Sequence, residues 1–205
     1  TFLKINYSLS INKHIYFDLK KTFFNSKKNS TNDDIHRALV NSVKSHTVSD
    51  VGYATQLSGG LDSSLITAIT SINKSKNFKL HTYSVSLNNK DVDERKFQKI
   101  VHKKYKTIHH NVVCNPKMIC ENISKMIWMY DYPLHHPNII PSYFMNNLAS
   151  KNKVKVMLSG DGADEIFEGY NWSLLNKKTI SKKTIFAGNF VPYKIIKKIF
   201  KNVDH

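Results

Sequence analysis

Two short glycine-rich segments contain the residues best suited to bind a charged ligand and to act on it. The first reads Ser-Gly-Gly-Leu-Asp-Ser-Ser over residues 58–64, and the second reads Ser-Gly-Asp-Gly-Ala-Asp over residues 159–164. Each follows a short apolar run and precedes residues with helical spacing, so each is expected as a loop between a strand and a helix. Free backbone amides and the helix dipole make such a loop a site for an anion, above all for a phosphate.

The first loop, residues 58–64, combines features of a phosphate site with one acidic residue. Gly59 and Gly60 allow backbone conformations and a close ligand approach that any Cβ would block, and the serine hydroxyls can donate further hydrogen bonds. Asp62 would repel a bare phosphate, but it suits a Mg²⁺ ion that bridges carboxylate and phosphate. A helix capped by Asp62 and Ser63 is the plainer alternative for the Ser-Gly-Gly turn. No lysine follows the second glycine, so the loop is not the GxxxxGK[ST] type that serves attack at the γ-phosphate.

The second loop, residues 159–164, agrees with the first. Ser159 and Gly160 end a strand, where their backbone can approach a nucleotide closely. Asp161 and Asp164 are expected to point their carboxylates into the same crevice as Asp62, and several carboxylates around a phosphate require a cation. The alternative treats Asp161 and Asp164 as helix caps, followed by solvated glutamates of a first helical turn.

The elements around these loops alternate in type from residue 51 onward. Strand patterns cover residues 51–57, 79–87, 107–114 and 154–158, and helix patterns cover residues 61–72, 93–106, 117–130 and 142–150, with another helix after the second loop. Between them, prolines in residues 131–141 predict an irregular turn. Strands separated by helices predict an open parallel α/β sheet sandwiched by helices. Ligands of such sheets bind beyond the carboxyl ends of the strands, where both loops are expected.

The ends of the chain are expected to differ from this centre. Residues 1–30 read as a hairpin-like entry followed by a polar linker, and a helix is predicted to begin near Asn32. We therefore divide the chain into a linker over residues 1–30, an α/β core over residues 31–175 and a basic helical part over residues 176–205. Apolar and lysine residues alternate with helical spacing in 193–203, which we interpret as a helix docked on another part of the protein rather than on a membrane.

Composition excludes several classes of function. The chain carries 31 Lys and Arg against 15 Asp and Glu, a net charge of +16, yet only Arg37 and Arg95 are arginine and the lysines are spread along the chain. No dedicated nucleic-acid surface is predicted, since such surfaces rely heavily on arginine. No apolar run reaches the ~20 residues that span a membrane. Cys114 and Cys120 form neither a disulfide framework nor a metal pair, so we expect a reducing cytoplasm.

The sequence contains two pairs of adjacent histidines, and histidine is a common zinc ligand. They are His109 with His110 and His135 with His136. Neighbouring residues of a strand point to opposite faces, and no third ligand has a suitable spacing. Zinc is therefore not predicted.

The two loops resemble a known family. The first is similar to the pyrophosphate loop of the ATP pyrophosphatase group, and the second, continued to Tyr170, resembles the second signature of the glutamine-dependent asparagine synthetases. The resemblance covers residues 45–172. It implies the ATP pyrophosphatase type of adenine-nucleotide α-hydrolase-like fold and cleavage of ATP between its α- and β-phosphates. The segment 131–144 is similar as well, but Tyr132 stands where the family usually has Glu.

The resemblance also implies roles for single residues. Asp62 and Asp164 would bind Mg²⁺, Asp161 would act in forming the adenylate intermediate, and Val85 would pack near the adenine. The implied nucleotide-binding set is Leu57, Ser58, Gly59, Gly60, Leu61, Asp62, Ser63, Ser64, Val85, Ser159 and Gly160.

The implied reaction is activation of the aspartate β-carboxylate by magnesium and ATP to β-aspartyl-AMP, followed by amidation with ammonia from glutamine. By this resemblance, a glutaminase domain is expected in the full protein. The chain begins with Thr1 and so lacks the cysteine nucleophile of that domain. It looks like a fragment, and we do not expect it to make asparagine alone. A homodimer is left open. Two alternatives remain: a related ligase acting on another carboxylate, and a non-catalytic basic module that binds RNA or membranes.

Overall fold

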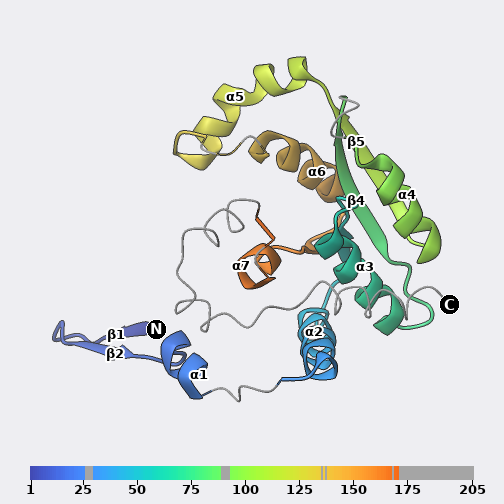
Figure 1. Ribbon diagram of the computed structural model, residues 1–205. Coiled ribbons are helices and arrows are strands. Elements are labelled where there is room, and N and C mark those ends of the chain that lie inside the picture. Colours follow the sequence, from blue (N-terminus) through green and yellow to red (C-terminus); the bar gives the residue numbers. More distant parts are fainter. Residues whose placement is uncertain (26–29, 89–92, 135, 137, 168, 171–205) are drawn as a thin grey trace, which may run out of the picture. The chain divides into compact units, whose positions relative to one another are not determined.

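A four-stranded sheet carries both glycine-rich loops in the computed structural model of the protein (Figure 1). Its strands are β3 (Tyr53–Gln56), β4 (His81–Leu87), β5 (Ile108–Cys114) and β6 (Val156–Leu158). They run parallel in the order β5-β4-β3-β6. Ala54 of β3 pairs with His81 of β4 on one side and with Met157 of β6 on the other.

The structure describes residues 1–25, 30–88, 93–134, 136, 138–167 and 169–170. The chain divides into two compact units, Thr1–Arg37 and Ala38–His205. The basic helical part predicted for residues 176–205 lies outside the described residues, as does His135.

Helices cover both faces of the sheet in the larger unit. Figure 1 shows α3 (Leu61–Asn73) and α4 (Arg95–Lys104) on one face, with α5 (Pro116–Tyr130) and α6 (Ile139–Lys151) on the other. Because both faces are covered, β4 is buried along most of its length, as strands of parallel sheets are. The predicted fold class, an open parallel sheet sandwiched by helices, is confirmed.

The strand order places the two loops side by side. The chain adds β4 and then β5 on one side of β3, and returns to add β6 on the other side. The carboxyl ends of β3 and β6 are therefore neighbours at the point where the strand order reverses. The first loop leaves β3 toward α3, and the second leaves β6 toward the short helix α7 (Ala163–Phe167).

The hydrophobic core lies between the sheet and α6. Ala54 and Tyr83 from the sheet pack against Met145 and Ala149 from α6, and all four are at most 5% exposed. On the other face, the hydroxyls of Thr55 and Thr67 lie 3.0 Å apart and link β3 to α3. This packing fixes the strand ends that carry the loops.

Two local predictions needed correction. α6 begins at Ile139, about three residues before the expected start, and includes Pro141, whose missing N–H costs nothing in a first helical turn. The sequence pattern predicts Leu61, Leu65, Ile69 and Ile72 on one face of α3, but Leu61 and Ile72 are 44% and 68% exposed, and the buried face is largely polar, with Thr67 and Ala68 beside Ile69. Among the described residues, no helix is long and apolar enough to cross a membrane.

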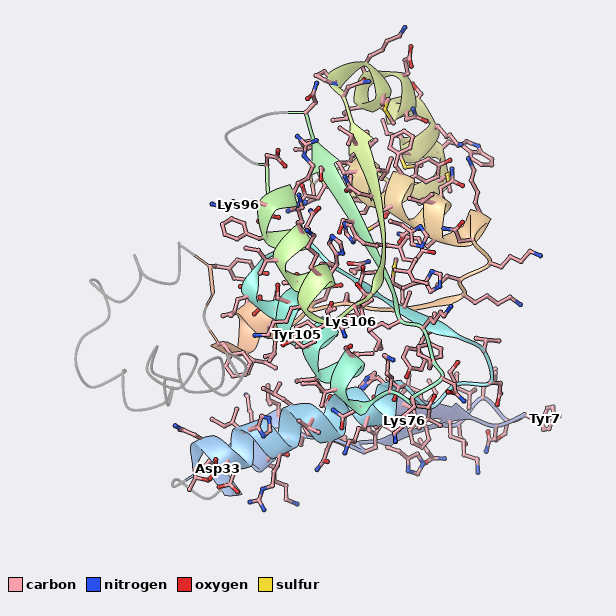
Figure 2. All side chains as sticks on the ribbon, turned by 90° about the vertical axis from the view of Figure 1, so that its right-hand side faces the viewer. Tyr7, Asp33, Lys76, Lys96, Tyr105 and Lys106 are labelled. Atoms are coloured by element: carbon pink, nitrogen blue, oxygen red, sulfur yellow. The ribbon has the colours of Figure 1, made fainter. Side chains whose placement is uncertain are left out.

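The smaller unit contains the hairpin expected at the start of the chain. β1 (Phe2–Ile5) pairs antiparallel with β2 (Ile11–His14), and Tyr7 projects from the connecting turn (Figure 2). A short helix that the sequence pattern did not predict, α1 (Leu19–Asn25), follows the hairpin. α2 (Asn32–His46) starts where predicted, because Thr31 and Asp34 cap each other's backbone amides at its first turn.

Candidate functional site

A pocket of about 470 Å³ lies at the carboxyl ends of the strands in the larger unit. Its size falls within the ~300–1,000 Å³ that is usual for ligand sites. Both loops, the end of β4, the start of α4 and the start of α6 contribute to its wall. The described lining residues are Gln56, Leu57, Ser58, Gly60, Asp62, Ser63, Ser84, Val85, Ser86, Leu87, Glu94, Asn138, Pro141, Ser142, Met145, Gly160, Asp161, Gly162, Asp164, Glu165 and Tyr170.

Charge in this lining is entirely of one sign. It contains five carboxylates, and among the described lining residues there is no lysine, arginine or histidine. This is unexpected in a chain with a net charge of +16. Among the described residues the basic side chains lie outside this lining, and Figure 2 shows Lys76, Lys96 and Lys106 at separate points of the larger unit.

The start of α4 packs against the backbone of the first loop. Gly59 has φ +98°, a conformation that residues with a Cβ rarely adopt. A Cβ there would lie 3.0 Å from Phe97 Cβ and 3.1 Å from both the Gln98 amide nitrogen and the Glu94 carbonyl oxygen. Glycine is therefore required by conformation and by space at this position.

Hydrogen bonds within the first loop fix its shape. The Ser63 hydroxyl lies 2.8 Å from the Ser58 hydroxyl and accepts from the Ser58 amide at 3.1 Å, while the Ser58 hydroxyl accepts from the Gly60 amide at 3.1 Å. The first intrahelical bond of α3 runs from the Ser64 amide to the Gly60 carbonyl. The amides of residues 61–63 precede it and have no helical acceptor, so they are available to an anion.

The second loop packs directly against the first. A Cβ added to Gly160 would lie 2.9 Å from Asp62 Cβ and 3.1 Å from both the Asp62 carbonyl carbon and the Ser63 amide nitrogen. Only glycine permits this approach of the two backbones. The contact brings the start of α3 and the end of β6 into one wall of the pocket.

The carboxylates of the two loops influence each other. Partial burial, and then the negative charge of Asp164, raise the pKa of Asp62 above its ordinary value. Asp161 is exposed at the pocket edge, where its Oδ2 accepts a hydrogen bond of 2.7 Å from the Ser159 hydroxyl. Carboxylate oxygens facing one another in a pocket suit a hard divalent cation.

Tyr170 and the segment after α7 complete this wall. The Tyr170 hydroxyl donates to Glu165 Oε1 at 2.6 Å, and this hydrogen bond raises the pKa of Tyr170 to about 12 and lowers that of Glu165. Gly169 lies against the Asp164 side chain, where an added Cβ would meet the carboxylate. The position of Asp164 thus depends on residues beyond the second loop.

Comparison with known proteins identifies the family of this chain. The family model described as asparagine synthase matches residues 34–199. The chain is 36% identical over 166 residues to the putative glutamine-hydrolyzing asparagine synthetase 2 of Methanocaldococcus jannaschii. This chain belongs to the asparagine synthase family.

Other members of the asparagine synthase family are similar over the same region. Identity is 36% over 158 residues with the glutamine-hydrolyzing asparagine synthetase 1 of Bacillus subtilis, and 31% over 169 residues with asparagine synthetase B of Escherichia coli. The three alignments cover 74% to 78% of this chain but only 24% to 30% of those relatives. The chain therefore spans less than a third of the length of these relatives.

Solved structures show a similar fold. The U34-tRNA thiolase of Methanococcus maripaludis aligns with a TM-score of 0.50 and 13% identity, over 86% of this chain and 65% of the thiolase. The NMN synthetase of Francisella tularensis aligns with a TM-score of 0.49 and 13% identity, over 69% of this chain and 59% of that protein. At this identity the thiolase likeness concerns the fold alone.

The structure brings together most of the site residues that the asparagine synthase resemblance implied. Nine of them line the pocket: Leu57, Ser58, Gly60, Asp62, Ser63, Val85, Gly160, Asp161 and Asp164. Gly59, Leu61, Ser64 and Ser159 are absent from its described lining. Three of these residues support the pocket without lining it: Gly59 faces α4, Ser64 is buried in α3, and Ser159 donates a hydrogen bond to Asp161. Leu61 is exposed.

The sequence analysis did not predict the lining residues Ser84, Ser86, Asn138 and Ser142. Ser84 and Ser86 lie on β4, and Asn138 and Ser142 lie at the start of α6. The usable signal for Ser84 and Ser86 was their place beside Val85, which was already assigned to the pocket, because residues from both faces line the pocket at the carboxyl end of β4. Nothing in the proline-rich segment before α6 marked Asn138 or Ser142, since only the packing of α6 on the sheet places them there.

Histidines lie on the sheet outside the pocket lining. His109 and His110 point to opposite faces of β5, as expected: His109 is 3.0 Å from the Thr82 hydroxyl, and His110 is 2.9 Å from His81. Burial, and to a lesser degree His102 and His110, lower the pKa of His109 to about 4. Within the described part of the chain, no three His, Cys, Asp or Glu side chains form a group suited to a metal ion.

Proposed function

We propose that this chain is the ATP-using part of an amide-forming ligase that activates the β-carboxylate of aspartate as β-aspartyl-AMP. The observation that carries the proposal is the composition of the pocket. Loop amides suited to phosphate stand beside five carboxylates, and the described lining offers no cationic side chain. Five carboxylates in the described lining favour a polyphosphate that binds together with a divalent cation. Membership of the asparagine synthase family supports the same reaction class.

The donor set fits magnesium. Mg²⁺ prefers oxygen ligands and commonly takes one or two carboxylates, with phosphate oxygens and water completing its shell. Asp62 and Asp164 supply two carboxylates, and the charge of Asp164 acts on Asp62, so we assign both to the ion. Bound with ATP, Mg²⁺ would neutralise charge on the triphosphate.

The residues of the chain bind and orient ATP. The amides at the start of α3 and the serine hydroxyls of the first loop would hold the β- and γ-phosphates, the part that leaves as pyrophosphate. Val85 and Met145 offer apolar surface in the same pocket, which suits the adenine ring. Asp161 lies at the pocket edge, where we propose that it acts near the reacting carboxylate and the α-phosphate.

The proposed reaction has two steps. A β-carboxylate oxygen of aspartate forms a bond to the α-phosphorus of ATP, and the bond from the α-phosphorus to the bridging oxygen breaks to release pyrophosphate. Ammonia then attacks the β-carbonyl carbon, AMP leaves with the oxygen that joined it, and the nitrogen loses a proton. The protein contributes orientation and charge stabilisation to both steps.

The source of ammonia is a further part of the proposal. The matched relatives are named as glutamine-hydrolyzing enzymes. We propose that ammonia comes from glutamine through a glutaminase domain of the full protein, and that the protein acts in the cytoplasm.

Exchange of labelled pyrophosphate into ATP tests this function. In the full protein, exchange should depend on aspartate and Mg²⁺, and asparagine should form when ammonia is added. Glutamate and other carboxylates supply the comparison for a related ligase with another substrate. Aspartate-independent exchange, or exchange that only another carboxylate supports, would contradict the assignment to aspartate.

A further inference from the structure

Gln98 lies beneath the first loop and contacts it through one hydrogen bond. The residue sits on the second turn of α4 and is 1% exposed. Its side-chain nitrogen Nε2 donates to the Ser58 carbonyl oxygen at 3.1 Å. The bond joins residues 40 positions apart in sequence, so only the packing of α4 on the loop creates it.

The other half of the Gln98 side chain is unsatisfied. Its oxygen Oε1 is buried and has no hydrogen-bond partner among the described residues. Leaving a buried acceptor unpaired destabilises the folded chain. Turning the amide over would place Oε1 against the Ser58 carbonyl oxygen, and two acceptors repel. An apolar side chain of similar size would remove this unpaired oxygen but would also leave the Ser58 carbonyl oxygen without its donor, so the hydrogen bond to the first loop is what glutamine specifically supplies here.

The geometry of the peptide bond suggests a role for this hydrogen bond. The Ser58 carbonyl and the Gly59 N–H belong to one planar peptide unit, and the described chain has no cis peptide bonds. The two groups of a trans unit point in opposite directions, so a carbonyl held by Gln98 directs the Gly59 N–H away from α4. The residues on either side of Gly59, Ser58 and Gly60, both line the pocket.

We propose that Gln98 is a positioning residue that fixes the peptide unit between Ser58 and Gly59, so that the Gly59 N–H serves the pyrophosphate portion of ATP. The inference rests on the proposed function. Glycine at position 59 allows this peptide unit to rotate, because no Cβ restricts it. The Gln98 donor removes that freedom before the ligand arrives, which lowers the cost of ordering the loop on binding.

Gln98→Met tests the inference in the full chain, because it keeps the volume and removes the donor and the unpaired oxygen. We expect affinity for pyrophosphate and for ATP, measured by calorimetry with Mg²⁺, to fall about tenfold. Adenosine affinity should stay unchanged, and the melting temperature should change little, because the lost hydrogen bond offsets the removal of the unpaired oxygen. Gln98→Glu keeps the shape but opposes two acceptors, so its loss of pyrophosphate affinity should be larger.

Thr70→Val is the matched control. The Thr70 hydroxyl is also buried without a partner among the described residues, but it lies on the last turns of α3, away from the first loop. This variant should bind pyrophosphate as the unsubstituted chain does.

The outcomes separate the two proposals. Retained ATP binding with no loss of pyrophosphate affinity in Gln98→Met would overturn the inference alone, and so would an equal loss for adenosine. If the unsubstituted chain binds no ATP, the proposed function and the inference both fail. Should Gln98→Met not fold, the ratio of pyrophosphate to adenosine affinity in Gln98→Glu decides in the same way.

Discussion

At Asp62, the negative charge that the proposed magnesium site requires is unfavourable for the folded chain without a metal ion. Its carboxylate faces the pocket, and partial burial together with Asp164 raises its pKa. Without a cation, the charged form is therefore less favourable in the folded chain than in the unfolded one. The same charge is what the proposed magnesium site requires. Function would then explain why the sequence keeps an acidic residue here.

Removal of either carboxylate should weaken metal-dependent binding. Asp62→Asn and Asp164→Asn are each expected to lower affinity for ATP at fixed Mg²⁺ by about tenfold or more, because a charged ligand is lost. Titration calorimetry measures the change. Glu121→Gln on the exposed surface of α5 is the control, because Glu121 is also an acidic residue but lies outside the pocket. Unchanged affinity in both variants would remove these residues from the metal site.

The raised pKa of Asp62 also predicts how stability depends on pH. A carboxyl group with a raised folded-state pKa contributes stability that is fully present below its unfolded pKa and is lost as pH rises through the folded pKa. In metal-free protein, Asp62→Asn should therefore unfold at a higher temperature than the unsubstituted chain at neutral pH. The difference should shrink as the pH falls below the ordinary carboxyl pKa. Thermal unfolding followed by circular dichroism across this range tests the sign, and a difference that grows toward acid pH would refute it.

At the scale of elements, the end of β6 and the start of α3 approach each other only through Gly160. A Cβ on this residue would lie 2.9 Å from Asp62 Cβ and 3.1 Å from backbone atoms of Asp62 and Ser63, so the two loops would have to move apart if it carried a side chain. The contact couples the last strand of the sheet to the first loop. Stability and ligand binding should therefore change together when it is altered.

Gly160→Ala tests this coupling. We expect a loss of about 1–3 kcal/mol in the free energy of unfolding, as for other overpacked sites, together with weaker ATP binding. Denaturant unfolding and calorimetry provide the two measurements. Gly52→Ala is the matched control, because a Cβ there would lie 3.9 Å from the Phe78 ring, an ordinary contact. Equal effects of the two substitutions would show that the close approach at Gly160 has no special role.

At the scale of the whole molecule, a basic protein holds an acidic pocket. The net charge of +16 attracts anions in general, but the described wall of the pocket repels them at short range. Under the proposed function, a bound cation would offset this repulsion inside the pocket, whereas the net charge acts on the approach of the nucleotide. This arrangement separates selective nucleotide binding from the general attraction of the surface.

Removal of divalent cations should reveal this separation. With EDTA at moderate salt, ATP affinity is expected to fall by more than about tenfold, whereas adenosine affinity should not change. Glu94→Gln, which removes one lining charge outside the two loops, should recover part of the metal-free ATP affinity. Equal ATP affinity with and without the metal would mean that the lining carboxylates do not govern binding.

Much of the fold and of the candidate site was open to prediction from local patterns. Alternation of strand and helix periods identified the parallel sheet, and the two glycine-rich loops identified Asp62, Asp161 and Asp164. The start of α6 was misplaced because Pro141 was interpreted as a break rather than as a first-turn residue. The buried face of α3 was misjudged because hydroxyl groups such as that of Thr67 find partners on the sheet, which no periodicity reveals.

The sequence by itself determined the local chemistry: which loops can expose amides, which side chains are charged and which residues lack a Cβ. These properties depend on a few neighbouring residues and on the allowed backbone conformations. Only the tertiary structure decided which groups meet. Three features join distant parts of the chain: the contact of Gly160 with Asp62, the hydrogen bond from Gln98 to Ser58, and the pocket wall formed by Ser84 and Ser142. They depend on the order of the strands and on how the helices pack across them.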